Sequence, residues 1–168
     1  MTRCAPMADT VTPRALLIVA LQDLHDAELT WIERSAELQR NASYRTGTYL
    51  AEEARAAQAQ ARRLESAIAA LDGDVQGPRN IWLRAILDDA ARDAETIAAG
   101  PLRDTALVGA FRKGKQAERV SYETAIGLAR RLNNDALVRT LTVSRDEEAR
   151  TDAALVILLD GILRDLVV

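Results

Sequence analysis

The chain has 168 residues, which suits one domain with a sizeable core. Hydrophobic residues make up 48% of it, aromatic residues only 4%, and glycines and prolines number 8 and 4, a composition that favours an all-α protein. The formal net charge is −3, with Lys and Arg dispersed among acids, which disfavours nucleic-acid binding. The early apolar run over 15–21 is too short to cross a membrane, so we expect a cytoplasmic protein.

The first half of the chain predicts a helical hairpin. Residues 1–11 carry no periodic pattern and are predicted to form a flexible N-terminus before a single domain over 12–168. Thr12 offers an N-cap and Pro13 a first helical residue, so a long helix is predicted to begin there. Its apolar stripe is interrupted by Glu28. The short connection over 41–43 predicts an antiparallel second helix, which ends before Gly73.

The second half predicts another hairpin after a crossover. Residues 74–79 contain Gly and Pro and cannot continue a helix, and a shorter helix is predicted over 81–99. A third long helix carries Glu118 in its apolar stripe and ends at Asn133, and a fourth carries Glu148 in the same way. Two antiparallel pairs joined by a long crossover that contains a helix predict the ferritin-like variant of the four-helix bundle.

The glutamates of these apolar stripes are predicted to meet at mid-bundle. Glu118 lies 15 residues before Asn133 and Glu148 lies 15 after it, so the two face each other at one height of the hairpin. Glu28 lies near the middle of the first helix, level with residues 56–57 of the second. Asp152 follows Glu148 by one turn and extends the same face. Carboxylates gathered in a dry core repel one another, so a cation or protons must join them.

Two kinds of cation fit this pattern. Hard oxygen ligands suit iron or manganese, and a pair of such ions bridged by glutamates would support oxygen or peroxide chemistry. The chain also carries cations of its own, because Lys115 lies one turn before Glu118 and Arg55 lies on the second helix near the expected site. Ion pairing with these residues would make a metal unnecessary. His25, one turn before Glu28, is a further possible ligand.

Three segments carry a resemblance to a known family. They are Leu21-Gln22-Asp23-Leu24-His25-Asp26-Ala27-Glu28, then Arg103-Asp104-Thr105-Ala106-Leu107 leading to Glu118, and Asp146-Glu147-Glu148-Ala149-Arg150-Thr151-Asp152. In order and spacing, the chain resembles the YciE/YciF family of bacterial ferritin-like proteins from about residue 16 to residue 163. The resemblance implies a dimeric four-helix bundle that is associated with stress responses and has a di-metal centre.

The chain departs from that family's pattern at the expected metal site. Glu28, Glu118, Glu148 and Asp152 match acidic positions of the family. The pair of glutamates that the family carries on its second helix falls on Arg55 and Ala56 here, and a glutamate of its third helix is replaced by Lys115, next to Gln116 in place of a histidine.

Glu52 and Glu53 could substitute for the lost acids from one turn away, although by residue count Glu53 would lie about 4.5 to 6 Å from the level of Glu118. We therefore expect a degenerate carboxylate site that is neutralised by Lys115 or Arg55 and holds no cofactor, with bound iron or manganese as the alternative. Such a protein would act through a homodimer or a protein partner rather than as an enzyme. If it were an enzyme, it would be a di-metal carboxylate oxidoreductase.

Overall fold

A computed structural model describes residues 10–166 of the chain. All regular secondary structure in this range is helical, which confirms the all-α prediction. None of its helices is long and apolar enough to cross a membrane. The five helices are α1 (Pro13–Asn41), α2 (Tyr44–Ala69), α3 (Ile81–Thr96), α4 (Pro101–Arg131) and α5 (Asp135–Arg164).

Short polar residues fix where the helices begin. Before α1, α2, α3 and α5, a side-chain oxygen accepts a hydrogen bond from a backbone N–H of the first turn. This N–H has no carbonyl partner within the helix, so the side chain satisfies it. The residues that do this are Thr12, Ser43, Asn80 and Asn134. The helix predicted over 81–99 ends earlier, at Thr96, because Ile97 is already extended and Gly100 takes a positive φ of 106° just before Pro101 opens α4.

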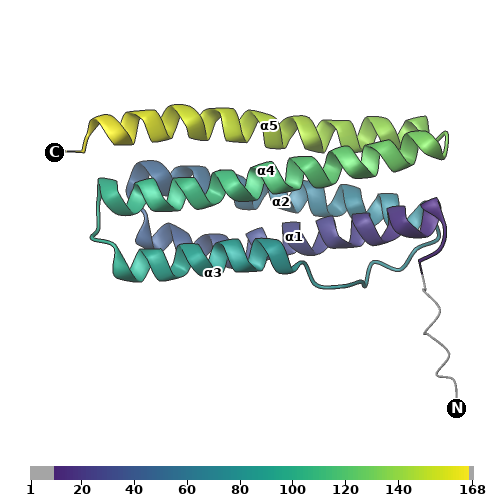
Figure 1. Ribbon diagram of the computed structural model, residues 1–168, viewed down its shortest axis with the longest axis horizontal. Helices are drawn as coiled ribbons and strands as arrows, with labels where there is room; N and C mark the ends of the chain where they lie inside the picture. The colour runs from purple at the N-terminus through teal and green to yellow at the C-terminus, as the bar shows by residue number, and fades with distance from the viewer. Residues whose placement is uncertain (1–9, 167–168) are drawn as a thin grey trace, which may run out of the picture.

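The four long helices form two antiparallel hairpins, α1 with α2 and α4 with α5 (Figure 1). After α2 the chain runs back along the molecule through residues 70–80 and α3, so that α2 and α4 point the same way (Figure 1). The shorter α3 packs against both α1 and α4, while α2 and α5 touch each other only sparsely. The predicted order of elements, with a helix inside the crossover, is therefore the observed one.

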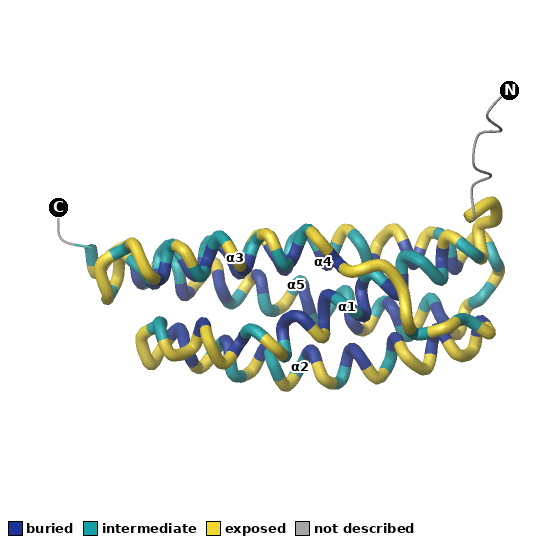
Figure 2. Tube along the Cα trace, turned by 90° about the horizontal axis from the view of Figure 1, so that it is seen from below, coloured by how far each residue is buried: buried dark blue, intermediate teal, exposed yellow. Residues whose placement is uncertain are grey.

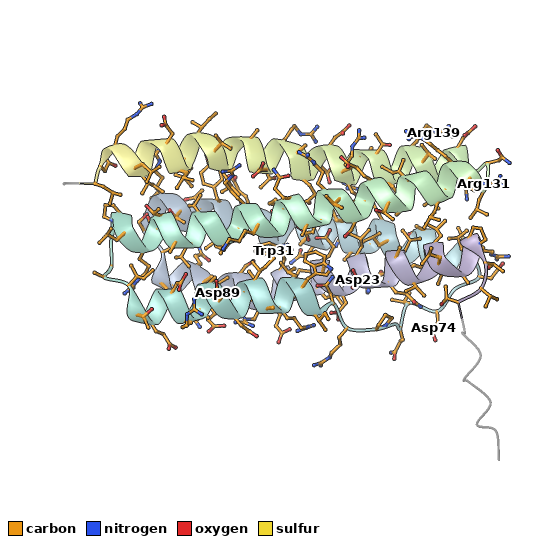
Figure 3. The ribbon with its side chains drawn as sticks, viewed as in Figure 1. Asp23, Trp31, Asp74, Asp89, Arg131 and Arg139 are labelled. Atoms are coloured by element: carbon orange, nitrogen blue, oxygen red, sulfur yellow. The ribbon has the colours of Figure 1, made fainter. Side chains whose placement is uncertain are left out.

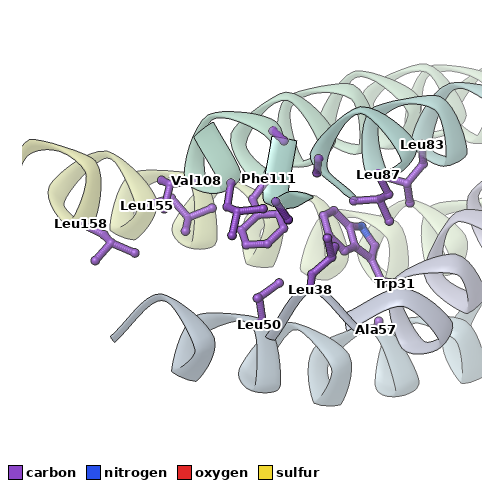
Figure 4. Close-up of a cluster of buried hydrophobic side chains, with 14 of the residues drawn as sticks. Trp31, Leu38, Leu50, Ala57, Leu83, Leu87, Val108, Phe111, Leu155 and Leu158 are labelled. Atoms are coloured by element: carbon purple, nitrogen blue, oxygen red, sulfur yellow. The ribbon is translucent and has the colours of Figure 1, made fainter. Parts of the chain in front are cut away.

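Buried residues line the inner faces of the helices (Figure 2) and form two apolar clusters. One cluster, shown in Figure 4, takes in residues 27–38 of α1, 107–111 of α4 and 155–162 of α5. The other takes in residues 17–24, 122–129 and 137–141 of the same helices. Buried polar side chains occupy the interval between the two clusters on each long helix, among them Gln60, Lys115, Glu118, Ser144 and Glu148. A polar layer thus divides the core.

Candidate functional site

A buried lysine is the centre of the polar layer. Lys115, on α4, is 1% exposed, and its Nζ lies 2.6 Å from Oε2 of Glu118 and 2.7 Å from Oε2 of Glu148. It also donates a hydrogen bond to Oε1 of Glu53 on α2. One oxygen from each of the three carboxylates lies within 4.8 Å of the other two. The three acids therefore surround a single ammonium group, and we call this set the lysine–carboxylate centre.

In this centre the charge of Lys115 and the charges of the glutamates determine one another's pKa values. Burial alone lowers the pKa of Lys115, but the carboxylates around it outweigh burial and raise that pKa well above the usual lysine value. Burial raises the pKa of Glu118 well above its usual range even though Lys115 opposes the shift, and the pKa of Glu53 is raised for the same reasons. One ammonium cannot neutralise several buried acids, so the centre favours keeping protons on some of them.

The indole of Trp31 packs against the lysine–carboxylate centre. Its Nε1 donates to Oε1 of Glu118 at 2.8 Å, and the Nζ of Lys115 lies 4.7 Å from the ring centroid, within the range of a cation–π contact. Trp31, labelled in Figures 3 and 4, also meets Phe111 edge to face with ring centroids 5.8 Å apart. The close approach needs a glycine, because a Cβ on Gly114 would lie 2.7 Å from the indole.

Glu28 lies beside this centre with a partner of its own. It is fully buried, and its Oε1 accepts a hydrogen bond of 2.8 Å from the hydroxyl of Tyr122, while its Oε2 has no hydrogen-bond partner among the described residues. Burial, followed by the charge of Glu148, raises the pKa of Glu28 well above its usual range. The phenol of Tyr122 is a neutral donor there, and its own pKa is raised by burial and by Glu28.

Three residues considered for the site lie outside it. Asp152 points elsewhere, because its Oδ1 accepts from Nε of Arg112 at 2.8 Å and its Oδ2 accepts from Gln116. Arg55, predicted as a neutralising partner, is exposed on α2, on the side of the helix that faces away from the core. His25 is buried, but its Nε2 lies 3.1 Å from Oε1 of Glu65, away from the three clustered carboxylates.

Glu53 is part of the lysine–carboxylate centre, although its position in the sequence predicts an offset from it. Counting residues from the hairpin turn placed it about one turn from the level of Glu118. The long stem of Lys115 spans this offset, since its Nζ reaches both carboxylates. Glu53 also continues the apolar seam of α2 through Leu50 and Ala57 in steps of three and four, and this spacing was the available signal.

The residues present do not fit a bridged pair of metal ions. Bundle proteins with such centres use a Glu-x-x-His motif on two helices, whereas Ser121 and Thr151 follow Glu118 and Glu148 at that spacing. Metal–oxygen bonds of about 2.0–2.2 Å would also have to converge on the space that the ammonium of Lys115 fills. In this structure the three carboxylates contact a cation that belongs to the chain itself.

Comparison with known proteins agrees with the fold and the resemblance. Residues 12–167 match the family described as Domain of unknown function (DUF892). The structure is similar to the stress protein YciF of E. coli, with a TM-score of 0.87 and 22% identity over 92% of this chain and 99% of that one. It is also similar to YcfI of Rhodopseudomonas palustris, with a TM-score of 0.84 and 24% identity over 90% of this chain and 97% of that one.

At these identities the two structures establish a common helical fold, and a search of curated proteins found no match. The family match, in contrast, spans residues 12–167, nearly the whole sequence. The chain therefore belongs to the DUF892 family of YciF-like helical proteins.

Proposed function

We propose that this protein is a ferritin-like four-helix bundle in which Lys115 takes the place of a bound metal. The bundle would serve in a stress response, in the cytoplasm, through a homodimer or a protein partner rather than through metal-dependent oxidation. The observation that carries this proposal is the position of Nζ among the oxygens of Glu53, Glu118 and Glu148. An ammonium held this way supplies the positive charge that a metal would otherwise bring.

The stress role draws on the likeness to YciF, which is described as a stress protein of E. coli. The ferritin-like assignment draws on two antiparallel hairpins joined by a crossover that makes α2 and α4 parallel. The alternative is a di-iron or di-manganese protein that handles oxygen or peroxide. Its support is the convergence of three carboxylates from three helices within 4.8 Å.

Metal content separates the two functions. We would purify the protein without chelator and measure iron, manganese and zinc per chain in the unmodified protein, in Lys115→Glu and in the exposed control Lys113→Glu. The proposal expects no stoichiometric metal in the unmodified protein, and a gain of metal in Lys115→Glu but not in Lys113→Glu, since only the first adds a carboxylate to the centre. Stoichiometric metal that disappears in Glu118→Ala would establish the alternative.

The assembly is tested separately by sedimentation velocity at micromolar concentration. A dimer mass supports the homodimer, and a monomer over the whole concentration range would contradict it. A mass far above a dimer would also contradict it.

A further inference from the structure

Helices α2 and α5 adjoin along a seam that side chains fill poorly. The two helices make sparse contact, whereas the opposite seam, between α1 and α4, is covered by α3. Grooves of about 490 Å³ and 230 Å³ lie along the α2–α5 seam. The larger is bordered by residues 59–70 and 134–140, and the smaller by residues 49–56 and 150–154. The two helical hairpins are thus joined firmly on one side of the bundle and weakly on the other.

One ion pair bridges this seam beside the larger groove. Nη1 of Arg63 on α2 lies 2.6 Å from Oε2 of Glu147 on α5, and Nη2 lies 2.8 Å from Oε1 of the same carboxylate. Arg63 also donates to the hydroxyl of Ser144 at 3.0 Å, and the buried amide of Gln60 donates to Glu147 at 3.0 Å. Within residues 10–166, these contacts are the side-chain hydrogen bonds that join α2 to α5. We call Arg63 and Glu147 the α2–α5 clasp.

The clasp is next to the lysine–carboxylate centre. Glu147 precedes Glu148, whose Oε2 lies 2.7 Å from Nζ of Lys115, so consecutive residues of α5 hold the clasp and the centre. Glu53 of α2 contacts the same ammonium and borders the smaller groove. Its side chain is 7% exposed, against 0% for Glu118 and 2% for Glu148. Water that entered between α2 and α5 would therefore meet the centre first at Glu53.

The opposite seam is held by packing as well as by charge. Leu83 and Leu87 of α3 are buried in one apolar cluster with residues of α1 and α4. Arg84 of α3 forms an ion pair of 3.1 Å with Asp26 of α1, which also accepts from the backbone N–H of Asn80. Separation of α1 from α4 would break this packing, whereas α2 and α5 share little packed surface at their seam. The bundle should therefore open first between α2 and α5.

We propose that the α2–α5 seam is an edge at which the bundle opens without unfolding, and that the Arg63–Glu147 clasp controls the access of solvent to the lysine–carboxylate centre. When the clasp parts, α2 and α5 separate while α1, α3 and α4 stay packed. The inference goes beyond the proposed function, because it concerns how the centre is reached and does not depend on which cation fills it.

Thiol labelling measures such opening in the full chain. Ala57 on the inner face of α2 and Ala90 on α3 are both 0% exposed, so a cysteine at either position reacts with iodoacetamide only when its surroundings open. Each cysteine is introduced together with Cys4→Ser, which removes the one native thiol. Ala57→Cys should react at least about tenfold faster than Ala90→Cys, and faster than global unfolding measured with urea allows.

Breaking the clasp tests its control of the seam. Arg63→Met should speed labelling of Ala57→Cys by about tenfold, and that of Ala90→Cys only as far as the urea stability falls. Arg84→Met is the matched control, because its ion pair has side chains 25% and 24% exposed, against 31% and 25% for the clasp. It should leave the ratio of the two labelling rates unchanged. The exchanged pair Arg63→Glu/Glu147→Arg should slow labelling of Ala57→Cys again.

Three outcomes would overturn the proposal. Equal labelling of the two cysteines at the rate of global unfolding would mean that the seam opens only when the whole chain unfolds. An equal change of the labelling ratio in Arg84→Met and Arg63→Met, or no slowing in the exchanged pair, would remove the clasp from its role. If Arg63→Met does not fold, Glu147→Gln, which removes only the charge, takes its place. Metal content is measured separately, so the proposed function and this inference can fail independently.

Discussion

Replacing Lys115 by methionine removes the positive charge of the lysine–carboxylate centre and keeps most of the volume of the side chain. Glu118 and Glu148 would then be 0–2% exposed with no cation between them, and Glu53 would lose its hydrogen-bond donor. Removing one partner of a buried ion pair costs about 3–5 kcal/mol. Since domains are stable by about 5–15 kcal/mol, the variant should lose a large share of its stability and melt about 10 °C lower.

Urea and thermal denaturation of Lys115→Met at neutral pH measure this loss, with Lys113→Met, an exposed lysine of the same helix, as the control. Protonation of the acids relieves their repulsion, so the loss should shrink as the pH is lowered. If Lys115→Met and Lys113→Met were equally stable, the ammonium would not be what holds the carboxylates together. A loss that did not vary with pH would contradict the electrostatic explanation.

Other consequences follow from individual contacts. The folded-state pKa of Glu28 is raised above the ordinary value of 4.5, so its contribution to stability is present at acidic pH and is lost as the pH rises through the folded-state pKa. Glu28→Gln, which remains neutral, should therefore flatten the fall in urea stability above pH 4.5. An unchanged pH profile would refute this. Gly114→Ala should lower the free energy of unfolding by about 1–3 kcal/mol and alter the fluorescence of Trp31, because the new Cβ would clash with the indole. The control Gly109→Ala, whose Cβ meets nothing within 4 Å, should be neutral or stabilising. Similar melting temperatures of the two variants would contradict the clash. Asp104→Ala should lower the free energy of unfolding by about 1–3 kcal/mol and speed hydrogen exchange at the start of α2, since this buried carboxylate accepts a hydrogen bond from the backbone N–H of Ser43. Unchanged exchange there would contradict this role of Asp104.

Local signals were sufficient to predict the fold. The Thr12-Pro13 pair and the short connection before Tyr44 fix one hairpin, and Asn134 fixes the other, because capping and turn residues act within a few residues of the chain. The end of α3 was the one clear boundary error. It depends on how residues 97–100 turn into α4, and periodicity does not reveal such a turn.

The site was harder to predict because its geometry depends on three helices at once. Symmetry about Asn133 placed Glu118 opposite Glu148, and the structure brings both to Lys115. A count of residues fixes height within a hairpin but not the reach of a side chain. It therefore predicts Glu53 as a substitute acid off the level of Glu118, whereas the stem of Lys115 bridges that offset. Asp152 was assigned to the site by its spacing, whereas the competing guanidinium of Arg112 could be located only in three dimensions.

The tether of Lys115 has a consequence for how the folded protein is completed. A counter-ion that is part of the chain is present at one copy per molecule from synthesis onward, it cannot be removed by a chelator, and the wrong element cannot replace it by mass action. If Lys115 takes the place of a metal as proposed, assembly of the bundle interior would require no delivery system and would be indifferent to scarcity or excess of transition elements. A cell whose metal supply is disturbed would still make this protein in its finished form.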